Sequence, residues 1–107
     1  MPKTLTSVTR LRTAPAARED VRGIRDYSKT AFGARVAREY LDGLIAVFTL
    51  IETRPLAGIA EPDLGEGMRS FGFRSHRIYY KLEGDDLLVV RILHSAQHIP
   101  EAFGSSQ

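Results

Sequence analysis

Apolar and polar side chains alternate along two neighbouring stretches in the last third of the chain, between Met68 and Leu82. The positions that share one side are Arg69, Phe71 and Phe73 in the first stretch and Ile78, Tyr80 and Leu82 in the second. A period of two is typical of a β-strand that buries one face. The pattern therefore predicts two strands in succession.

A third strand is predicted after a turn. Gly84 tolerates positive φ, and the two Asp residues that follow it can hydrogen-bond their own backbone. From Leu87 to Leu93 the chain is apolar on both sides except at Arg91, which favours a strand inside the sheet. Strict alternation puts its side chains on two faces, with Leu87, Val89 and Leu93 on one and Leu88, Val90 and Ile92 on the other.

Between Thr13 and Gly33, apolar side chains recur at steps of three and four, which predicts an amphipathic helix with Pro15 in its first turn. We expect Thr13 to cap it. Glu19 and Asp20 suit its positive end, and Gly33 should end it through positive φ. The apolar stripe consists of Ala17, Val21, Ile24, Ser28 and Ala31, widened by Tyr27 and Phe32.

A second helix is predicted for residues 34–53. Gly43 in its middle indicates close packing or simple tolerance, because Gly costs about 1 kcal/mol there relative to Ala. Pro55 ends the helix, and the Gly- and Pro-rich residues 56–67 should form an ordered surface loop. The apolar band, broad enough to contact both the first helix and the sheet, consists of Val36, Tyr40, Leu41, Leu44, Ile45, Val47, Phe48 and Ile51.

A short strand around Val8, over residues 7–12, completes the order β-α-α-β-β-β. We therefore expect an α+β fold in which a helical hairpin packs on a small, mainly antiparallel four-stranded sheet. Residues 1–107 form one domain, and residues 1–6 and 104–107 are expected to be flexible. No element covers the other face of the sheet, whose apolar positions favour a partner polypeptide over self-association or a curled sheet.

Composition argues against a disulfide-stabilised domain and against a membrane-spanning helix. The chain has 43% hydrophobic and 26% charged residues, as soluble globular domains do. It has no Cys, and no apolar run approaches the roughly 20 residues that span a bilayer. We expect a cytoplasmic protein. Twelve of the 15 basic residues are Arg, which suits forked contacts to carboxylates, but a GC-rich genome produces the same bias.

The His and Ser residues do not form a recognisable catalytic or metal site. His76 should have a structural role between strands, while His94 at the end of the last strand either bonds the backbone or faces a target. His94 and His98 lack a third ligand, so we expect no metal. No base is arranged around a Ser, no phosphate-binding Gly loop is present, and no cofactor is expected. Arg77 and Arg91 should pair with Glu83 or Asp86.

Three runs resemble a known family. They are PAAREDVRGIRDY, FGARVAREYLDGLIAVFTLIETRP and GMRSFGFRSHRIYYKLEGDDLLVVRILHSAQ. Their order and spacing are similar to those of the toxins of ParD–ParE toxin–antitoxin pairs, within the RelE/ParE superfamily. The strongest part is SHRIYY at residues 75–80 followed by VRILH at residues 90–94, and the resemblance covers roughly residues 8–100.

The resemblance implies a bacterial toxin held inactive by a ParD-like antitoxin in a hetero-oligomer. Toxins of the ParE branch inhibit DNA gyrase and catalyse no reaction, so gyrase is the expected target. Their antitoxins combine a ribbon-helix-helix DNA-binding part with a tail that folds on the toxin. The resemblance implies neither membrane binding nor specific nucleic-acid binding by this chain alone.

The alternative is the RelE-like branch, whose members cleave messenger RNA in the ribosome on the same fold. Those nucleases use basic residues of the sheet with an Arg or His and a Tyr near the C-terminus. Arg74 matches a basic position, but Gln97 aligns with the Arg and Phe103, which has no hydroxyl, with the Tyr. An alignment shifted by one residue would place His98 there instead. These replacements favour the inhibitor.

The candidates for contact with the antitoxin or the target therefore lie on the strands and in the C-terminal segment. They are Arg69, Arg74, Arg77, Tyr79, Arg91, Leu93, His94, His98 and Phe103.

Overall fold

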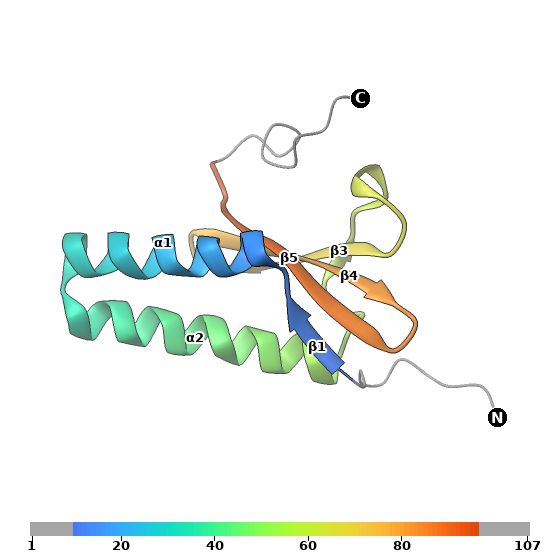
Figure 1. The fold of residues 1–107 in the computed structure, drawn as a ribbon, viewed down its shortest axis with the longest axis horizontal. Coiled ribbons are helices and arrows are strands. Elements are labelled where there is room, and N and C mark those ends of the chain that lie inside the picture. Colours follow the sequence, from blue (N-terminus) through green and yellow to red (C-terminus); the bar gives the residue numbers. More distant parts are fainter. Residues whose placement is uncertain (1–9, 97–107) are drawn as a thin grey trace.

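A computed structural model describes residues 10–96, which form two helices and a five-stranded sheet in the order β1-β5-β4-β3-β2 (Figure 1). β1 pairs with β5 in parallel, and the other neighbours are antiparallel. The predicted α+β class is confirmed. Val8 and the predicted flexible ends lie outside the described residues.

The elements are β1 (Arg10–Thr13), α1 (Pro15–Phe32), α2 (Ala34–Thr53), β2 (Ile59–Ala60), the 3-10 helix η1 (Pro62–Leu64), β3 (Met68–Phe73), β4 (His76–Glu83) and β5 (Asp86–His94).

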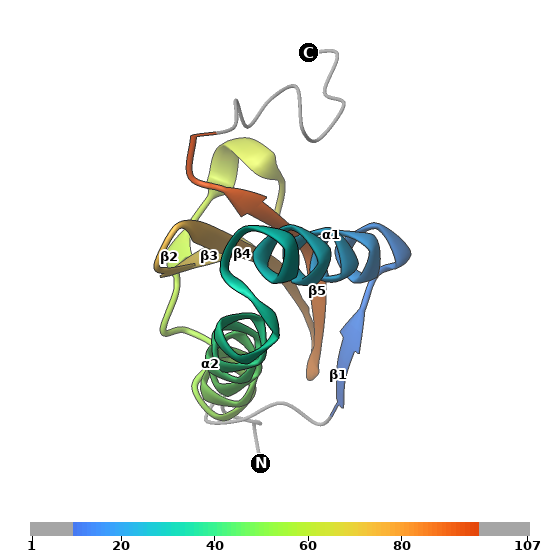
Figure 2. The same cartoon turned by 90° about the vertical axis from the view of Figure 1, so that its left-hand side faces the viewer.

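The fifth strand is the two-residue β2, which lies within the predicted loop and pairs with Arg69 and Ser70 of β3. Its shortness explains why alternation did not reveal it, since two residues carry no period. The two helices lie on one face of the sheet (Figure 2). None of the described helices is long and apolar enough to cross a membrane.

The helices begin and end where local chemistry predicts, but not for all the predicted reasons. Gly33, at φ 95°, ends α1 and begins α2. The N-cap of α1 is Ala14, without a side-chain cap, so the capping role of Thr13 is wrong. Thr13 instead ends β1, and its carbonyl accepts a hydrogen bond of 2.6 Å from Arg18. The first turn of α1 contains no acidic residue, so the predicted dipole roles of Glu19 and Asp20 are also wrong.

The main core lies between the helical hairpin and the sheet. Gly43 of α2 allows this close packing, because a Cβ there would lie 2.5 Å from the ring of Phe73 and the ring would have to shift. Of the two interpretations of this glycine, close packing and simple tolerance, the structure supports close packing. The buried residues of this core are Ala17, Ile24, Leu44, Val47, Ile51, Ile78, Tyr80, Leu87, Val89 and Ile92.

A β-bulge in β5 changes which side chains reach that core. Tyr79 pairs with Arg91 and Tyr80 with Val89, so one residue of β5 is left without a partner on β4. The alternation is therefore shifted by one residue beyond this point. Ile92 is in the main core with Val89, whereas Leu93 is on the other face. The prediction that Leu93 shares a face with Val89 is wrong for this reason.

The other face of the sheet is partly covered by its own chain. Met68, Tyr79 and Leu93 form a second cluster there, exposed by 7%, 4% and 1%, with Leu64 of η1 packed against it. The prediction that no element covers this face is therefore wrong. Among the described residues, the exposed large apolar side chains lie on the helices, in the α2–β2 connection and on β2: Tyr27, Phe32, Val36, Ile45, Leu56 and Ile59.

Candidate functional site

Arg91, a predicted contact residue, forms a structural ion pair with Asp20. Its Nε and one Nη donate to the two carboxylate oxygens of Asp20 at 2.7 and 2.9 Å, and the backbone N–H of Ile92 donates to the same carboxylate at 2.9 Å. The hydrogen bond to Asp20 raises the pKa of the Arg91 guanidinium. β1 pairs with β5 only as far as Val89, so Asp20 of α1 satisfies a backbone donor beyond the end of β1.

The predicted partners of Arg91 and Arg77 are therefore wrong. Glu83 pairs with Lys81 at 3.2 Å, and Asp86 pairs with Arg10 at 3.4 Å. The Arg91–Asp20 pair joins residues 71 positions apart, which no spacing rule predicts.

Arg69 is also engaged in holding the fold together. Its Nη2 donates to the carbonyls of Gly58 and Leu56 at 2.7 and 3.3 Å, which fixes the connection between α2 and β2. The buried hydroxyl of Tyr80 accepts from the N–H of Gly58 at 2.9 Å and donates to the carbonyl of Pro55 at 2.7 Å. Both side chains serve the same connection.

Arg77 lies on the sheet face opposite the helices with much of its hydrogen-bonding capacity unused. Among residues 10–96, its side chain makes one hydrogen bond, a long contact of 3.5 Å to the hydroxyl of Ser70, which itself donates to Glu61 at 2.6 Å. The guanidinium lies against the backbone of Gly72, where an added Cβ would be 3.5 Å from two of its nitrogens. No carboxylate of the described residues forms an ion pair with it.

Tyr79 lies in the same area and is buried. Burial and the negative charge of Glu61 raise the pKa of the Tyr79 hydroxyl, and the positive charge of Arg77 opposes this. The hydroxyl therefore stays protonated at neutral pH. The prediction that Tyr79 and Tyr80 point to opposite faces is confirmed by their membership of the two separate clusters.

Arg74 occupies the turn between β3 and β4 at φ 52°, the one non-glycine residue with positive φ among those described. Its guanidinium lies over the ring of Phe73, 5.5 Å from the ring centre. This cation–π contact orients the side chain and leaves its N–H donors available.

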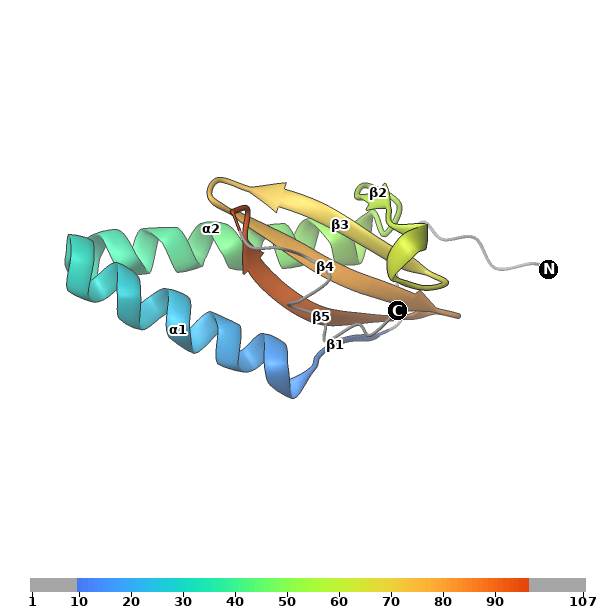
Figure 3. The ribbon, with the colours of Figure 1, turned by 90° about the horizontal axis from the view of Figure 1, so that it is seen from above.

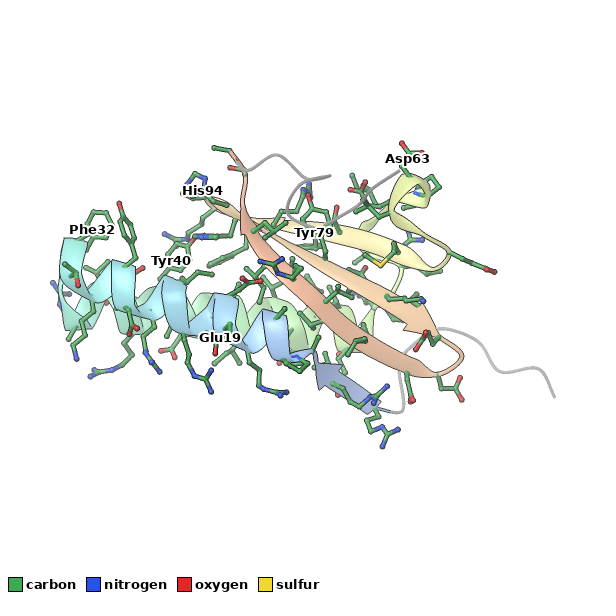
Figure 4. All side chains as sticks on the ribbon, turned by 45° about the horizontal axis from the view of Figure 1, so that its top comes forward. Glu19, Phe32, Tyr40, Asp63, Tyr79 and His94 are labelled. Carbon is green, nitrogen blue, oxygen red and sulfur yellow. The ribbon has the colours of Figure 1, made fainter. Side chains whose placement is uncertain are left out.

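The ring of His76 contacts those of Tyr40 and His94 edge to face, so the three form an aromatic cluster. Tyr40 and His94 are labelled in Figure 4. The Tyr40 hydroxyl and His76 Nδ1 are 2.7 Å apart, and the two imidazole rings are 5.3 Å apart. Burial, and then the nearby His94, lower the pKa of His76, while Asp20 opposes the shift. His76 thus bridges α2, β4 and β5, as its predicted structural role requires. His94 Nδ1 accepts from the N–H of Ala96 at 3.1 Å.

The remaining predicted residues are divided between the core and the undescribed part of the chain. Leu93 is almost fully buried in the second cluster. Gln97, His98 and Phe103 lie outside the described residues. Within residues 10–96, no three His, Asp or Glu side chains are placed to bind a metal ion together.

An exposed aromatic patch at the end of the helical hairpin was missed by the sequence analysis. Tyr27 and Phe32 were assigned to the buried stripe, but they are 69% and 63% exposed. Their rings contact each other edge to face, with centres 6.4 Å apart. No local pattern predicts this exposure, because it arises where the end of the hairpin extends past the sheet beneath it (Figure 3).

Comparison with known proteins gives consistent results. Residues 11–99 match the family model described as the ParE toxin of the type II toxin–antitoxin system parDE. The chain is 29% identical over 94 residues to Toxin ParE3 of Caulobacter vibrioides, a match that covers 88% of this chain and 93% of that protein.

Two solved structures have a similar fold. A chain of the chromosomal ParDE system from P. aeruginosa superposes with a TM-score of 0.70 at 15% identity, covering 85% of this chain and 98% of that one. A chain of the RelBE2 toxin–antitoxin complex from Mycobacterium tuberculosis gives a TM-score of 0.56 at 17% identity, covering 85% and 95%.

Proposed function

Since this chain belongs to the ParE toxin family of type II toxin–antitoxin systems, we propose that a ParD-like antitoxin neutralises it and that its target is DNA gyrase. The observation that carries the proposal is the family match, which spans every described strand and helix from Leu11 onwards. In this proposal the chain inhibits by binding and performs no chemistry of its own.

The use of the basic side chains supports an inhibitor over a ribosome-dependent nuclease. Cleavage of RNA requires a base, an acid and cations that converge on one phosphate. Arg91 is neutralised by Asp20, and Arg69 is bound to backbone carbonyls on the side of the sheet that carries Phe71. In the part of the chain that the structure describes, no second Arg with unused donors lies beside Arg77 on the sheet face opposite the helices.

Arg77 is the sheet residue that we propose to contact the antitoxin. Its guanidinium is held against Gly72 and has donors to spare, so a carboxylate can bind it in a forked geometry at little cost in side-chain entropy. Arg74, Tyr79, Leu93, His94, His98 and Phe103 remain proposed contacts of lower priority.

A supercoiling assay tests the proposed target. The purified chain, added in excess, should block DNA supercoiling by gyrase of the same organism or trap cleaved DNA, and prior mixing with the ParD-like antitoxin should restore activity. Unchanged gyrase activity at excess chain refutes gyrase as the target. Cuts at codon positions in translated messages after expression would instead establish the nuclease alternative.

A growth assay tests neutralisation separately. Expression of the chain alone should arrest growth, and coexpression with the antitoxin should relieve the arrest. An arrest that persists despite abundant soluble antitoxin contradicts neutralisation, whichever target is hit.

A further inference from the structure

The end of the helical hairpin extends beyond the sheet that the rest of the hairpin covers (Figure 3). All eight residues from 29 to 36 are exposed. The apolar side chains of Tyr27, Phe32 and Val36 are 69%, 63% and 38% exposed there, and Phe32 is at the far end of α1 (Figure 4). We call residues 22–39 the hairpin tip. Clustered exposed aromatic side chains of this size are typical of interaction sites.

The hairpin tip is also more positively charged than the rest of the chain. It has five basic and two acidic residues, a net charge of +3, whereas the whole chain has +2 and the remainder therefore −1. Asp26 and Glu39 are already paired with Arg25 and Arg35. The five basic residues, all exposed, are Arg22, Arg25, Lys29, Arg35 and Arg38.

Lys29 and Arg38 have no ion-pair partner among residues 10–96. They are therefore the cations available to an incoming negative charge. A second copy of the chain would bring like charges together at this surface, which opposes self-association. An acidic partner with apolar side chains satisfies both the charge and the aromatic patch.

We propose that the hairpin tip docks an acidic, amphipathic segment of the antitoxin. Apolar residues of that segment pack on Tyr27 and Phe32, and its carboxylates pair with Lys29 and Arg38. A helical segment with apolar anchors three or four residues apart and acidic residues beside them has the required form. The proposal rests on neutralisation by an antitoxin and specifies the surface that it uses.

The apolar contact is tested by comparing two equally exposed side chains. Phe32→Ala should weaken the binding of purified antitoxin by about tenfold or more, as loss of an aromatic anchor does. Ile59→Ala is the matched control, because Ile59 is 59% exposed but lies on β2, away from the hairpin tip. Isothermal titration calorimetry measures both affinities, and circular dichroism confirms that both variants are folded.

The charge contact is tested with a pair of double variants. Lys29→Glu with Arg38→Glu should weaken binding and reduce its dependence on salt concentration. Arg12→Glu with Arg54→Glu changes the net charge equally at exposed positions outside the hairpin tip, and should leave affinity within about threefold.

Several outcomes overturn the docking surface. One is an equal effect of tip and control variants, or no effect of either, while the wild-type chain binds the antitoxin. Another is normal antitoxin binding by Phe32→Ala together with loss of a property of the wild-type chain: binding to vesicles of anionic phospholipid would indicate a membrane site, and a dimer in sedimentation would indicate self-association. If the wild-type chain does not bind the antitoxin at all, neutralisation itself fails and the docking surface with it.

Discussion

Removal of the Asp20 carboxylate should destabilise the fold more than removal of any other charged side chain of α1. The Asp20 side chain is 15% exposed and that of Arg91 24%, so the pair is shielded but not fully desolvated. The substitution Asp20→Ala removes three hydrogen bonds and leaves the Ile92 N–H and the Arg91 charge without this partner. Breaking a buried pair costs about 3–5 kcal/mol, and we take the lower end, about 3 kcal/mol, because the pair is partly solvated.

Thermal and denaturant unfolding measure this effect. A loss of about 3 kcal/mol in a chain of this length lowers Tm by roughly 12–20 °C. Glu19→Ala is the control, because Glu19 is 74% exposed and its pair with Arg22 is solvated, so a change within about 0.5 kcal/mol is expected. Asp20→Asn retains one oxygen that can accept from Ile92 and should be less damaging than Asp20→Ala.

A double-mutant cycle with Arg91→Met isolates the pair itself. We expect a coupling free energy of about 1.5–3 kcal/mol between the two side chains. A coupling below about 0.5 kcal/mol, or a loss for Asp20→Ala no larger than that for Glu19→Ala, would refute the role of this contact in attaching α1 to β5.

Three further predictions concern the core and its edge. The pKa of His76 is lower in the folded chain than its ordinary value of 6.5, so the unfolded chain binds the proton more readily. The free energy of unfolding should therefore fall as pH decreases through about 6.5 towards the lowered pKa of the folded chain. Guanidinium unfolding at about pH 7.5 and 5 should show a smaller fall of this free energy for His76→Gln than for the wild type. Gly43→Ala should lower the free energy of unfolding by about 1–3 kcal/mol through the clash with Phe73. In the double variant with Phe73→Leu, part of this loss should be restored, whereas a loss equal to the sum of the two single losses would argue against the clash. Tyr80→Phe should cost about 1–3 kcal/mol in urea unfolding, since a buried N–H and a buried carbonyl each lose a partner, and a change under about 0.5 kcal/mol would contradict this.

The ends of the helices and the three long strands could be predicted because short-range chemistry determines them. Pro15, Gly33 and Pro55 act on their own backbone dihedral angles or on those of the adjacent residue. The α+β class follows from the order of these elements. For the same reason, the resemblance to ParE toxins is visible in runs of consecutive residues.

The tertiary structure alone decided the pairings and the exposed surfaces. Asp20 bonds Arg91 because β1 ends before β5 does, and the bulge opposite Tyr79 and Tyr80 moves Ile92 into the core. Phe32 continues the pattern of a buried stripe, yet it is exposed because this end of the hairpin extends beyond the sheet that the rest of the hairpin covers. An apolar side chain is buried only where another element meets it, and the positions of elements distant in sequence are set by packing over the whole chain.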